Sequence, residues 1–403
     1  MKRSVLVIAP YIPLPANFGG ALRIYHLIRQ LARHYDVSLL APGNADEMSY
    51  AFELGQKCDV TVVPGATQAR RPASRRKRME QMRSLLLSSS YLQASAFNPR
   101  MQSALDRILM TRRIDLVQYE FPESALYRVP PTIATLFDAH NVEHDLLARV
   151  ARTSSTTGKR VFNMHEARKL KRLELEIWDR STLCIATSER DANLMRGLTS
   201  TPVDVVPNGV DLTHFATAPL ADATPASVVF TGAMRHQPNA DGARWYVEQV
   251  HARVQDMLPA THITIVGADP PASVQALASE SVSVTGRVDD VSPYLRQSNV
   301  VVVPLFSGGG TRLKILEAFA SGRPVVSTSL GAEGLQVCDG EHILLADDAS
   351  GFADAVVRLA QDRDLATRLT ASARQLVEQH YGWETIAAKL MQAHERAIEL
   401  HTG

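Results

Sequence analysis

Short apolar strands that alternate with amphipathic helical stretches constrain this chain more than any other feature of its sequence. In the first half, the predicted strands cover residues 4–9, 37–40, 60–63, 115–119 and 133–137, and a helical spacing of apolar residues runs over residues 21–33. Uniformly apolar strands separated by helices are typical of a parallel sheet that is covered on both faces. The sequence therefore predicts an α/β fold.

The same pattern restarts near residue 200 and predicts a second unit of the same kind. Its predicted strands cover residues 203–206, 228–231, 262–266, 282–285 and 299–304. A chain of 403 residues is also longer than one hydrophobic core usually organises. We expect two doubly wound parallel-sheet domains, at residues 1–200 and 201–383. Such sheets bind ligands at the carboxyl ends of their strands, so we expect the two halves to face a cleft.

Composition argues against several classes of protein. Lys and Arg number 43 and Asp and Glu 42, so a net charge of +1 gives no general attraction to nucleic acid. No apolar run approaches the ~20 residues of a membrane-spanning helix, and the apolar start of the chain stops at Pro10, too early for a signal peptide. Cys58, Cys184 and Cys338 are too widely spaced for a metal-ligand pair, so we expect buried, reduced thiols. These features favour a cytoplasmic protein.

One segment departs from this balanced composition. From Arg70 to Arg78 the chain holds six positive charges in nine residues, and apolar residues follow. A solvated loop that leads into a helix explains the segment. Contact with anionic lipid headgroups, or with a phosphorylated lipid acceptor, explains it too.

Two loops of the first half carry candidate functional residues. Gly19 and Gly20 follow the first strand and open the first helix, where backbone N–H groups can approach an anion, although a plain tight turn explains them equally well. His140 follows a later strand and can donate a hydrogen bond or act as a base. His140 and His144 have the spacing of a metal pair, but the H-E-x-x-H pattern is absent. A structural histidine in a loop is the other alternative for His140.

The stretch over residues 307–318 is the most informative in the chain. Three glycines at 308–310 free the backbone after an apolar strand, and Thr311 can cap the helix that follows. Arg312 and Lys314 add positive charge, so the loop suits a diphosphate. The carboxylate of Glu317 lies over one turn further along, where it could accept hydrogen bonds from ribose hydroxyls. The spacing is not that of a P-loop, and a glycine-rich turn before a core helix remains an alternative.

Two further glycine loops, at residues 232–239 and 331–334, also follow strands of the second half. In a parallel sheet all these loops meet at one edge, so their convergence is stronger evidence than any one of them.

These motifs together resemble the GT-B glycosyltransferases of the retaining family 4 type, and more narrowly the bacterial enzymes that build exopolysaccharide, lipopolysaccharide or other surface glycans. The resemblance rests on the order and spacing of residues 18–20, 138–143, 187–191, 207–211, 230–232, 265–267, 285–288, 310–320 and 322–326. It implies two Rossmann-like domains that face a cleft, with a C-terminal helix at 384–403 that crosses back to complete the N-terminal domain.

The resemblance also implies roles for individual residues. A nucleotide-diphosphate sugar would bind in the C-terminal half, and a glycan or lipid-linked acceptor mostly in the N-terminal half. Glu317 would hold the ribose, Thr311 and neighbouring amides the diphosphate, and Arg287 would flank the base, while His140 would lie near the transferred sugar. The candidate catalytic residues are His140, Arg312 and Lys314. The candidate donor-binding residues are Gly19, Gly20, Gly232, Arg235, Arg287, Gly309, Gly310, Thr311 and Glu317.

The chain departs from the family pattern at two places. The family often has two glutamates with seven residues between them; Glu317 is the second, and Gly309 stands where the first would be. The family also commonly has Arg and Lys in the loop after the first C-terminal strand, where this chain has Ala233 and a Pro-Asn pair at 238–239. We expect Arg312 and Lys314, with Arg235 as a weaker candidate, to replace that charge.

The resemblance implies a hexosyltransferase-type enzyme with no cofactor and no metal, because front-face transfer lets the leaving phosphate deprotonate the acceptor. The D-x-D sequence at residues 362–364 is interpreted as solvated surface. We expect a cytoplasmic protein, with a peripheral contact to the inner membrane through the segment from Arg70 to Arg78. Two alternatives remain open: a GT-B nucleotide-sugar epimerase, and a non-catalytic partner that binds the nucleotide sugar.

Overall fold

A computed structural model describes residues 2–64, 84, 89–153 and 156–403 of the chain. The basic segment from Arg70 to Arg78 lies outside the described residues. The chain divides into two compact units, one of Met1–Pro207 with Ile386–Gly403 and the other of Asn208–Thr385.

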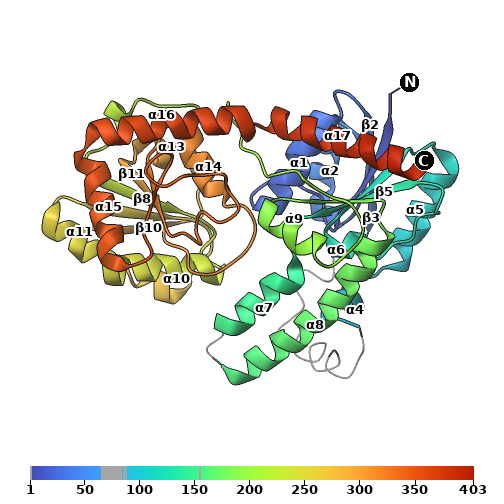
Figure 1. The fold of residues 1–403 in the computed structure, drawn as a ribbon, viewed down its shortest axis with the longest axis horizontal. Coiled ribbons are helices and arrows are strands. Elements are labelled where there is room, and N and C mark those ends of the chain that lie inside the picture. Colours follow the sequence, from blue (N-terminus) through green and yellow to red (C-terminus); the bar gives the residue numbers. More distant parts are fainter. Residues whose placement is uncertain (1, 65–83, 85–88, 154–155) are drawn as a thin grey trace. The chain divides into compact units, whose positions relative to one another are not determined.

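The first unit is built on a parallel sheet, as its apolar strands predict. Seven strands form this sheet within the described residues, in the order β3-β2-β1-β4-β5-β6-β7. Figure 1 labels β2, β3 and β5 of this sheet. Their bounds are β1 (Ser4–Ile8), β2 (Asp36–Gly43), β3 (Asp59–Pro64), β4 (Leu116–Glu120), β5 (Ala134–Ala139), β6 (Leu183–Ala186) and β7 (Val203–Val205). β6 was missed from the sequence because its four residues follow a long helix after only two residues. The strand predicted at residues 203–206 for the second unit is β7 of this first sheet, so its assignment to the second unit is wrong.

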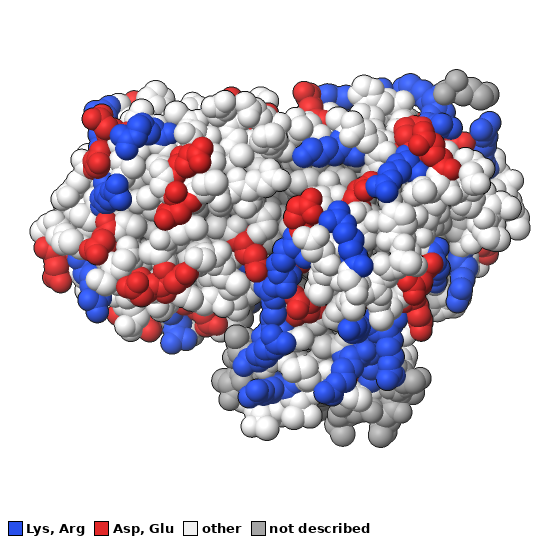
Figure 2. All heavy atoms as spheres, in the orientation of Figure 1, with Lys and Arg blue, Asp and Glu red and all other residues white. Residues whose placement is uncertain are grey.

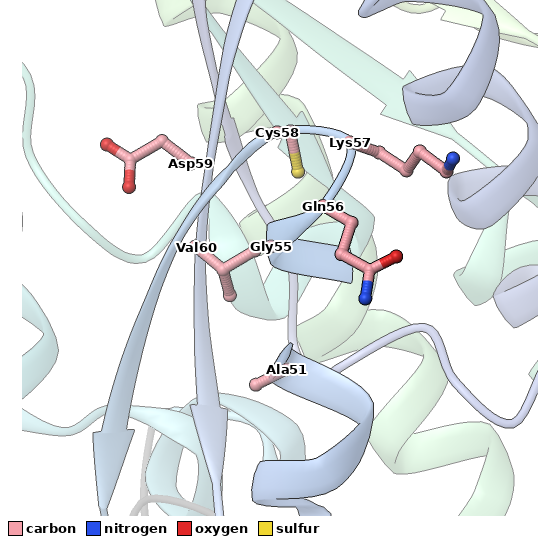
Figure 3. A pocket seen from close by; sticks show the side chains of 7 residues that line it. All are labelled: Ala51, Gly55, Gln56, Lys57, Cys58, Asp59 and Val60. Carbon is pink, nitrogen blue, oxygen red and sulfur yellow. The ribbon is translucent and has the colours of Figure 1, made fainter. Parts of the chain in front are cut away.

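Helices connect these strands, and the last helix of the chain returns to the same unit. The helices are α1 (Gly19–Leu31), α2 (Met48–Gly55), α4 (Tyr91–Ala96), α5 (Pro99–Thr111), α6 (Phe121–Ser124), α7 (Glu143–Thr153), α8 (Thr157–Arg180), α9 (Glu189–Arg196) and α17 (Trp383–Thr402). A shallow hollow lies beside α2 and β3, lined by residues 51 and 55–60 (Figure 3).

The second unit repeats the design. In its described part, six parallel strands follow the order β10-β9-β8-β11-β12-β13. They are β8 (Ser227–Thr231), β9 (His262–Val266), β10 (Val282–Gly286), β11 (Val300–Val303), β12 (Val325–Ser327) and β13 (Leu344–Leu345). The helices are α10 (Gln237–Trp245), α11 (Ala252–Met257), α12 (Ala272–Gln275), α13 (Ser292–Gln297), α14 (Leu313–Ala320), α15 (Ala349–Gln361) and α16 (Arg363–His380).

The central strands of each sheet are buried on both faces, and this is why they are largely apolar. All four valines of β11, Val300–Val303, are 0% exposed. Burial of one such side chain stabilises the fold by about 1.5–3 kcal/mol. The two Rossmann-like parallel sheets confirm the predicted α/β fold class.

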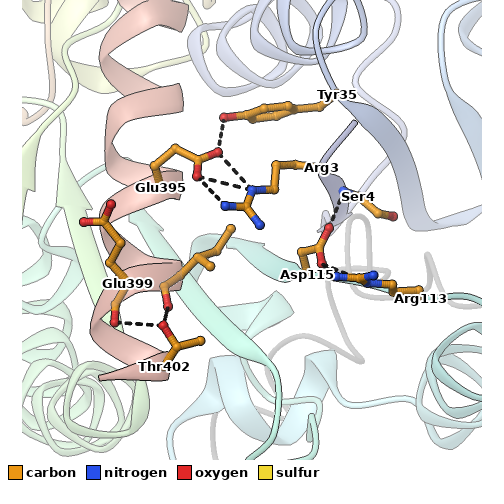
Figure 4. Close-up of polar contacts among 9 residues, drawn as sticks. Arg3, Ser4, Tyr35, Arg113, Asp115, Glu395, Glu399 and Thr402 are labelled. Atoms are coloured by element: carbon orange, nitrogen blue, oxygen red, sulfur yellow. Dashed lines mark hydrogen bonds and ion pairs between the residues drawn. The ribbon is translucent and has the colours of Figure 1, made fainter. Parts of the chain in front are cut away.

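Polar contacts hold α17 against the first unit. Glu395 on α17 accepts hydrogen bonds from Arg3, at 2.9 Å from its Nη2, and from the hydroxyl of Tyr35 at 3.2 Å (Figure 4). Arg396 pairs with Asp204. The C-terminal helix therefore joins residues that lie at opposite ends of the sequence.

The described residues also test two expectations drawn from composition. Their helices include none that is both long and apolar enough to cross a bilayer. Cys58 and Cys184 are buried, but Cys338 is exposed, so the expectation of three buried thiols is wrong for Cys338. Cys338 lies in the loop between β12 and β13, where no helix covers it.

Candidate functional site

A close approach of three residues defines the edge of the second sheet beyond β8. Gly232 follows β8 with a φ of +152°, and a Cβ at this position would lie 2.6 Å from Nζ of Lys314 and 2.8 Å from Nδ2 of Asn239. A larger residue at position 232 would therefore displace the Lys314 ammonium. Glycine is required here for space as well as for backbone conformation.

Lys314 lies on the first turn of α14, and its ammonium group points toward the end of β8. Its Nζ donates a hydrogen bond of 2.8 Å to Oδ1 of Asn239 and lies 4.4 Å from the centre of the Phe230 ring. Burial, together with the positive charge of Arg312, lowers the pKa of Lys314 to about 7. An anionic ligand would therefore stabilise the charged form of this buried ammonium strongly.

Glu317 lies one turn beyond Lys314 on the same helix. Its side chain is half-buried and forms no hydrogen bond or ion pair among the described residues. Burial raises the pKa of Glu317 to about 7, although Lys314 and His214 oppose that shift. The carboxylate oxygens are thus available to hydroxyl donors of a ligand.

The glycine loop before α14 adopts a conformation that depends on its glycines. Gly308 has a φ of +110° and Gly310 a φ of +72°, which side chains rarely adopt. Arg312 folds back over this loop, and its Nη1 donates to the carbonyl oxygens of Gly309 and Gly310. The helix begins at Leu313 with Arg312 as its N-cap, and the Arg312 side chain forms no capping hydrogen bond. The prediction that Thr311 is the N-cap of α14 is therefore wrong, because the helix begins one residue later than a cap at Thr311 would require.

Two predicted arginines lie on a more exposed rim of the same sheet edge. Nη1 of Arg235, after β8, lies 3.0 Å from Oδ2 of Asp269, and Nη2 of Arg287, after β10, lies 3.8 Å from the same oxygen. Asp269 itself follows β9. The structure therefore places Arg235 and Arg287 together around one carboxylate, while Lys314 carries the charge beside Asn239.

In the first unit, Gly20 and His140 belong to one cluster. A Cβ at Gly20 would lie 2.5 Å from the hydroxyl oxygen of Tyr11 and 2.8 Å from Cζ of Phe121. The Phe121 ring stacks on the His140 ring with centroids 3.8 Å apart. Phe121 has a φ of +66°, a strained conformation for an aromatic residue. Gly19 is the first residue of α1.

A chain of short hydrogen bonds leads away from His140. Nε2 of His140 lies 2.6 Å from Oε2 of Glu120, whose Oε1 accepts a 2.5 Å bond from the amide of Gln118. Oε1 of Gln118 lies 2.7 Å from Nε2 of His394 on α17. Burial lowers the pKa of His140 to about 3 and raises that of Glu120 to about 7. His140 is therefore a neutral imidazole, and the protonation state of Glu120 determines whether Nδ1 or Nε2 of His140 carries the proton.

Buried charges beside His140 satisfy one another. Arg23 donates to Asp138 at 2.9 and 3.1 Å, and also to the carbonyl oxygen of Pro207 at 2.8 Å. Ligand atoms of Glu120, Asp138 and His140 lie within 4.8 Å of one another, as a metal site would need. Arg23 already neutralises Asp138, however, so the group is a satisfied polar network.

The i, i+4 histidines bind separate carboxylates. Nδ1 of His144 lies 2.7 Å from Oε2 of Glu174 on α8, while His140 contacts Glu120. The two imidazoles therefore do not converge on one ligand.

Sequence reasoning missed Glu120, Arg23 and Asn239. Glu120 had a usable signal, because it directly follows a predicted strand, and it pairs in register with Asp138 on the neighbouring strand. Arg23 carried no such signal, since a cation on an amphipathic helix normally faces water. Asn239 was noted only because it lies in a loop where the family commonly has Arg and Lys. Its side chain in fact positions Lys314.

The fold of the chain is shared by solved structures of the GT-B fold. Sucrose-phosphate synthase from Thermosynechococcus elongatus aligns at 18% identity with a TM-score of 0.73, over 99% of this chain and 100% of that one. HepE from Anabaena, in complex with UDP, aligns at 13% identity with a TM-score of 0.67, over 98% of this chain and 100% of that one.

Two family models match the chain in succession. The model "Glycosyltransferase Family 4" matches residues 19–214, and "Glycosyl transferases group 1" matches residues 225–362. The chain belongs to the glycosyltransferases of the family 4 type. The predicted family and the predicted enzyme class, a glycosyltransferase, are thereby confirmed.

Relatives extend this assignment. A phosphatidyl-myo-inositol mannosyltransferase from Mycolicibacterium smegmatis is 29% identical over 211 residues, which make up 50% of this chain and 53% of that protein. An uncharacterized 44.6 kDa protein in the cps region of Klebsiella pneumoniae is 22% identical over 94% of this chain and 96% of its own length. The lipopolysaccharide core biosynthesis glycosyltransferase LpsE from Rhizobium meliloti is 33% identical over 34% of this chain and 42% of its own. The chain spans about half the length of the mannosyltransferases that it matches.

Proposed function

We propose that this glycosyltransferase moves a hexose, with retention of configuration, from a nucleotide-diphosphate donor to a glycan or lipid-linked acceptor in bacterial surface polysaccharide biosynthesis. One observation carries the proposal. The ammonium of Lys314, positioned by Gly232 and Asn239, lies one turn before the unpaired carboxylate of Glu317 on α14. A cation and an acceptor with this spacing fit the diphosphate and the ribose of one nucleotide sugar.

Lys314 and Arg312 supply the charge that the leaving group needs. When the sugar departs, negative charge develops on the β-phosphate, and preorganised cations stabilise it most in the transition state. The pKa of Lys314 is about 7 in the protein alone. The negative charge of a bound diphosphate raises that pKa and so keeps Lys314 protonated. With two cations in this role, the reaction needs no metal ion and no other cofactor.

The proposed transfer takes place on one face of the sugar. The bond between C1 and the phosphate oxygen breaks, and its electron pair stays on the diphosphate. The acceptor hydroxyl forms the new bond to C1 from the same face and gives its proton to the leaving phosphate oxygen. No side chain acts as a nucleophile, and the anomeric configuration is retained.

His140 is proposed to orient the transferred sugar or the acceptor. Its Nε2 contacts Glu120 at 2.6 Å, and its Nδ1 forms no hydrogen bond among the described residues. A neutral imidazole fixed by Phe121 and Glu120 can bond a sugar hydroxyl without carrying charge into the site.

The names of the relatives support the acceptor class. One relative is named for mannosyl transfer to phosphatidyl-myo-inositol, another for lipopolysaccharide core biosynthesis, and a third is encoded in a cps region. We extend the proposal to a cytoplasmic protein with a peripheral membrane contact through the segment from Arg70 to Arg78.

A donor screen followed by a transfer assay tests the proposal. Thermal shifts across UDP- and GDP-sugars identify the donor, because a ligand of the native state raises the melting temperature. The radiolabelled donor is then incubated with a membrane extract. Label in lipid or polymer supports transfer. Saturable binding without a product supports a non-catalytic binding partner, and an interconverted donor supports an epimerase.

Variants test the site itself. Glu317→Ala and Arg312→Ala should each remove most of the transfer and the donor-induced thermal shift. The exposed residues Glu280 and Arg358 of the same unit provide matched controls as Glu280→Ala and Arg358→Ala. Full turnover in both site variants would show that the donor binds elsewhere.

A further inference from the structure

One face of the hairpin of α7 and α8 carries positive side chains that form no ion pair with any described residue. Six side chains make up this basic face: Arg152, Lys159, Arg160, Arg168, Lys171 and Arg172. All are exposed except Lys171, which is half-buried. None of the six has an ion-pair partner in the part of the chain that the structure describes. Figure 2 shows Lys and Arg side chains gathered over α7 and α8.

The acidic residues of α8 that lie nearest in sequence to these positive charges point inward. They are Glu166 and Glu174, which are 4% and 0% exposed, whereas the exposed Glu176 and Asp179 lie near the C-terminal end of the helix. Glu166 pairs with Lys169 at 2.9 Å, and Glu174 accepts hydrogen bonds from the backbone N–H groups of Glu143 and His144. The protein is nearly neutral as a whole, yet this face is locally positive.

The spacing along α8 gathers the charges on one side of the helix. Arg160, Arg168 and Arg172 follow one another at intervals of eight and four residues, which lie within about a third of a turn of each other. Val161 lies among them and is 63% exposed. The basic face therefore combines long cationic side chains with an uncovered apolar one.

We infer that the basic face docks on a membrane surface rich in anionic phospholipid. Guanidinium groups bind lipid phosphates, and their field reaches about one Debye length into solution. The exposed Val161 would enter the apolar boundary below the headgroups, a role that a soluble polyanion does not offer it. This inference assigns membrane contact to described residues other than the segment from Arg70 to Arg78, and it does not depend on the identity of the donor.

Vesicle sedimentation with the full chain tests the inference. The protein should pellet with phosphatidylcholine vesicles that contain phosphatidylglycerol but not with phosphatidylcholine alone, and high salt should weaken binding. Changing Arg160, Arg168, Lys171 and Arg172 to Gln should reduce the partition coefficient at least ~10-fold.

A matched variant controls for net charge. Changing Arg253, Arg358, Arg363 and Arg368 to Gln removes the same charge from exposed positions of the second unit and should leave vesicle binding unchanged. Circular dichroism and the donor-induced thermal shift confirm that each variant folds.

Four results would overturn the inference. They are wild-type binding by the basic-face variant, equal losses in both variants, equal binding to neutral vesicles, and binding of a soluble acidic polysaccharide with none to vesicles. A further variant, with Gln at the basic positions from Arg70 to Arg78, tests the other candidate for the membrane contact. If it alone abolishes binding, that segment is the contact and the basic face is not.

Discussion

Lys314 is the residue on which the candidate donor site most depends. Lys314→Met keeps the length of the side chain and its contact with Phe230 but removes the charge. We expect kcat/KM for transfer to fall about 10²–10³-fold, as when one preorganised donor to a developing anion is lost. Steady-state kinetics measures this, with Lys57→Met, an exposed lysine of the first unit, as the control. A loss below threefold would argue against a role for Lys314 in transfer.

The Glu317 carboxylate should lower the free energy of unfolding at neutral and higher pH, although the proposed donor site needs this carboxylate. The pKa of Glu317 is about 7 in the folded protein and 4.5 in the unfolded chain. The folded state therefore binds the proton more tightly, and the free energy of unfolding falls as pH rises between these values. Glu317→Gln removes this penalty. Because the side chain is half-buried, we expect a gain of about 1–2 kcal/mol at pH 8 and little change at pH 4.5. Urea unfolding at both pH values measures it, and an equal effect at both would contradict the assignment.

Glu120 should act on the pH dependence of transfer through His140. With Glu120 ionised, Nε2–H of His140 donates to it and Nδ1 accepts. With Glu120 protonated, its O–H donates to Nε2 and Nδ1–H donates instead. The pKa of Glu120 is about 7, so the rate should change across neutral pH. Glu120→Gln should flatten the profile of kcat near pH 7, whereas loss of packing alone would lower kcat equally at every pH.

At the scale of elements, the loop before α14 depends on backbone conformation. Gly310→Ala forces a side chain into a φ of +72°, at a cost of about 1–2 kcal/mol. The strain falls on the loop that should cradle the diphosphate, so the donor-induced thermal shift should shrink as well. Gly158→Ala is the control, because a Cβ there would meet no atom within 4 Å, and we expect it to be neutral or slightly stabilising. Equal destabilisation by both changes would refute this account of the loop.

The sequence predicted elements better than contacts, for a physical reason. The strand β11 was predicted within one residue at each end and the helix α1 within two, because burial on both faces or on one face leaves a local pattern. The bond between Lys314 and Asn239 joins residues 75 apart, and nothing local in the sequence encodes it. The inward turn of Arg23 toward Asp138 is likewise set by a partner 115 residues away.

At the scale of the whole molecule, the chain crosses from one unit to the other twice, so its C-terminus stabilises the unit that contains its N-terminus. The buried face of α17 includes Ile386, Leu390 and Ala397, each 0% exposed, and Glu395 binds Arg3. Without residues 386–403, the first unit loses this apolar burial and a polar partner for its first strand, while the second unit keeps all of its own residues.

Calorimetry can separate the two units on this basis. We expect two unfolding transitions, of which truncation after Thr385 lowers only one, by roughly 5–10 °C or more, since several buried side chains are lost. The nucleotide part of the identified donor should raise only the other transition, because its proposed contacts, Lys314 and Glu317, lie within Asn208–Thr385. A single transition that shifts with both treatments would mean that the units unfold together, and it would remove the basis for treating the donor site as a property of the second unit alone.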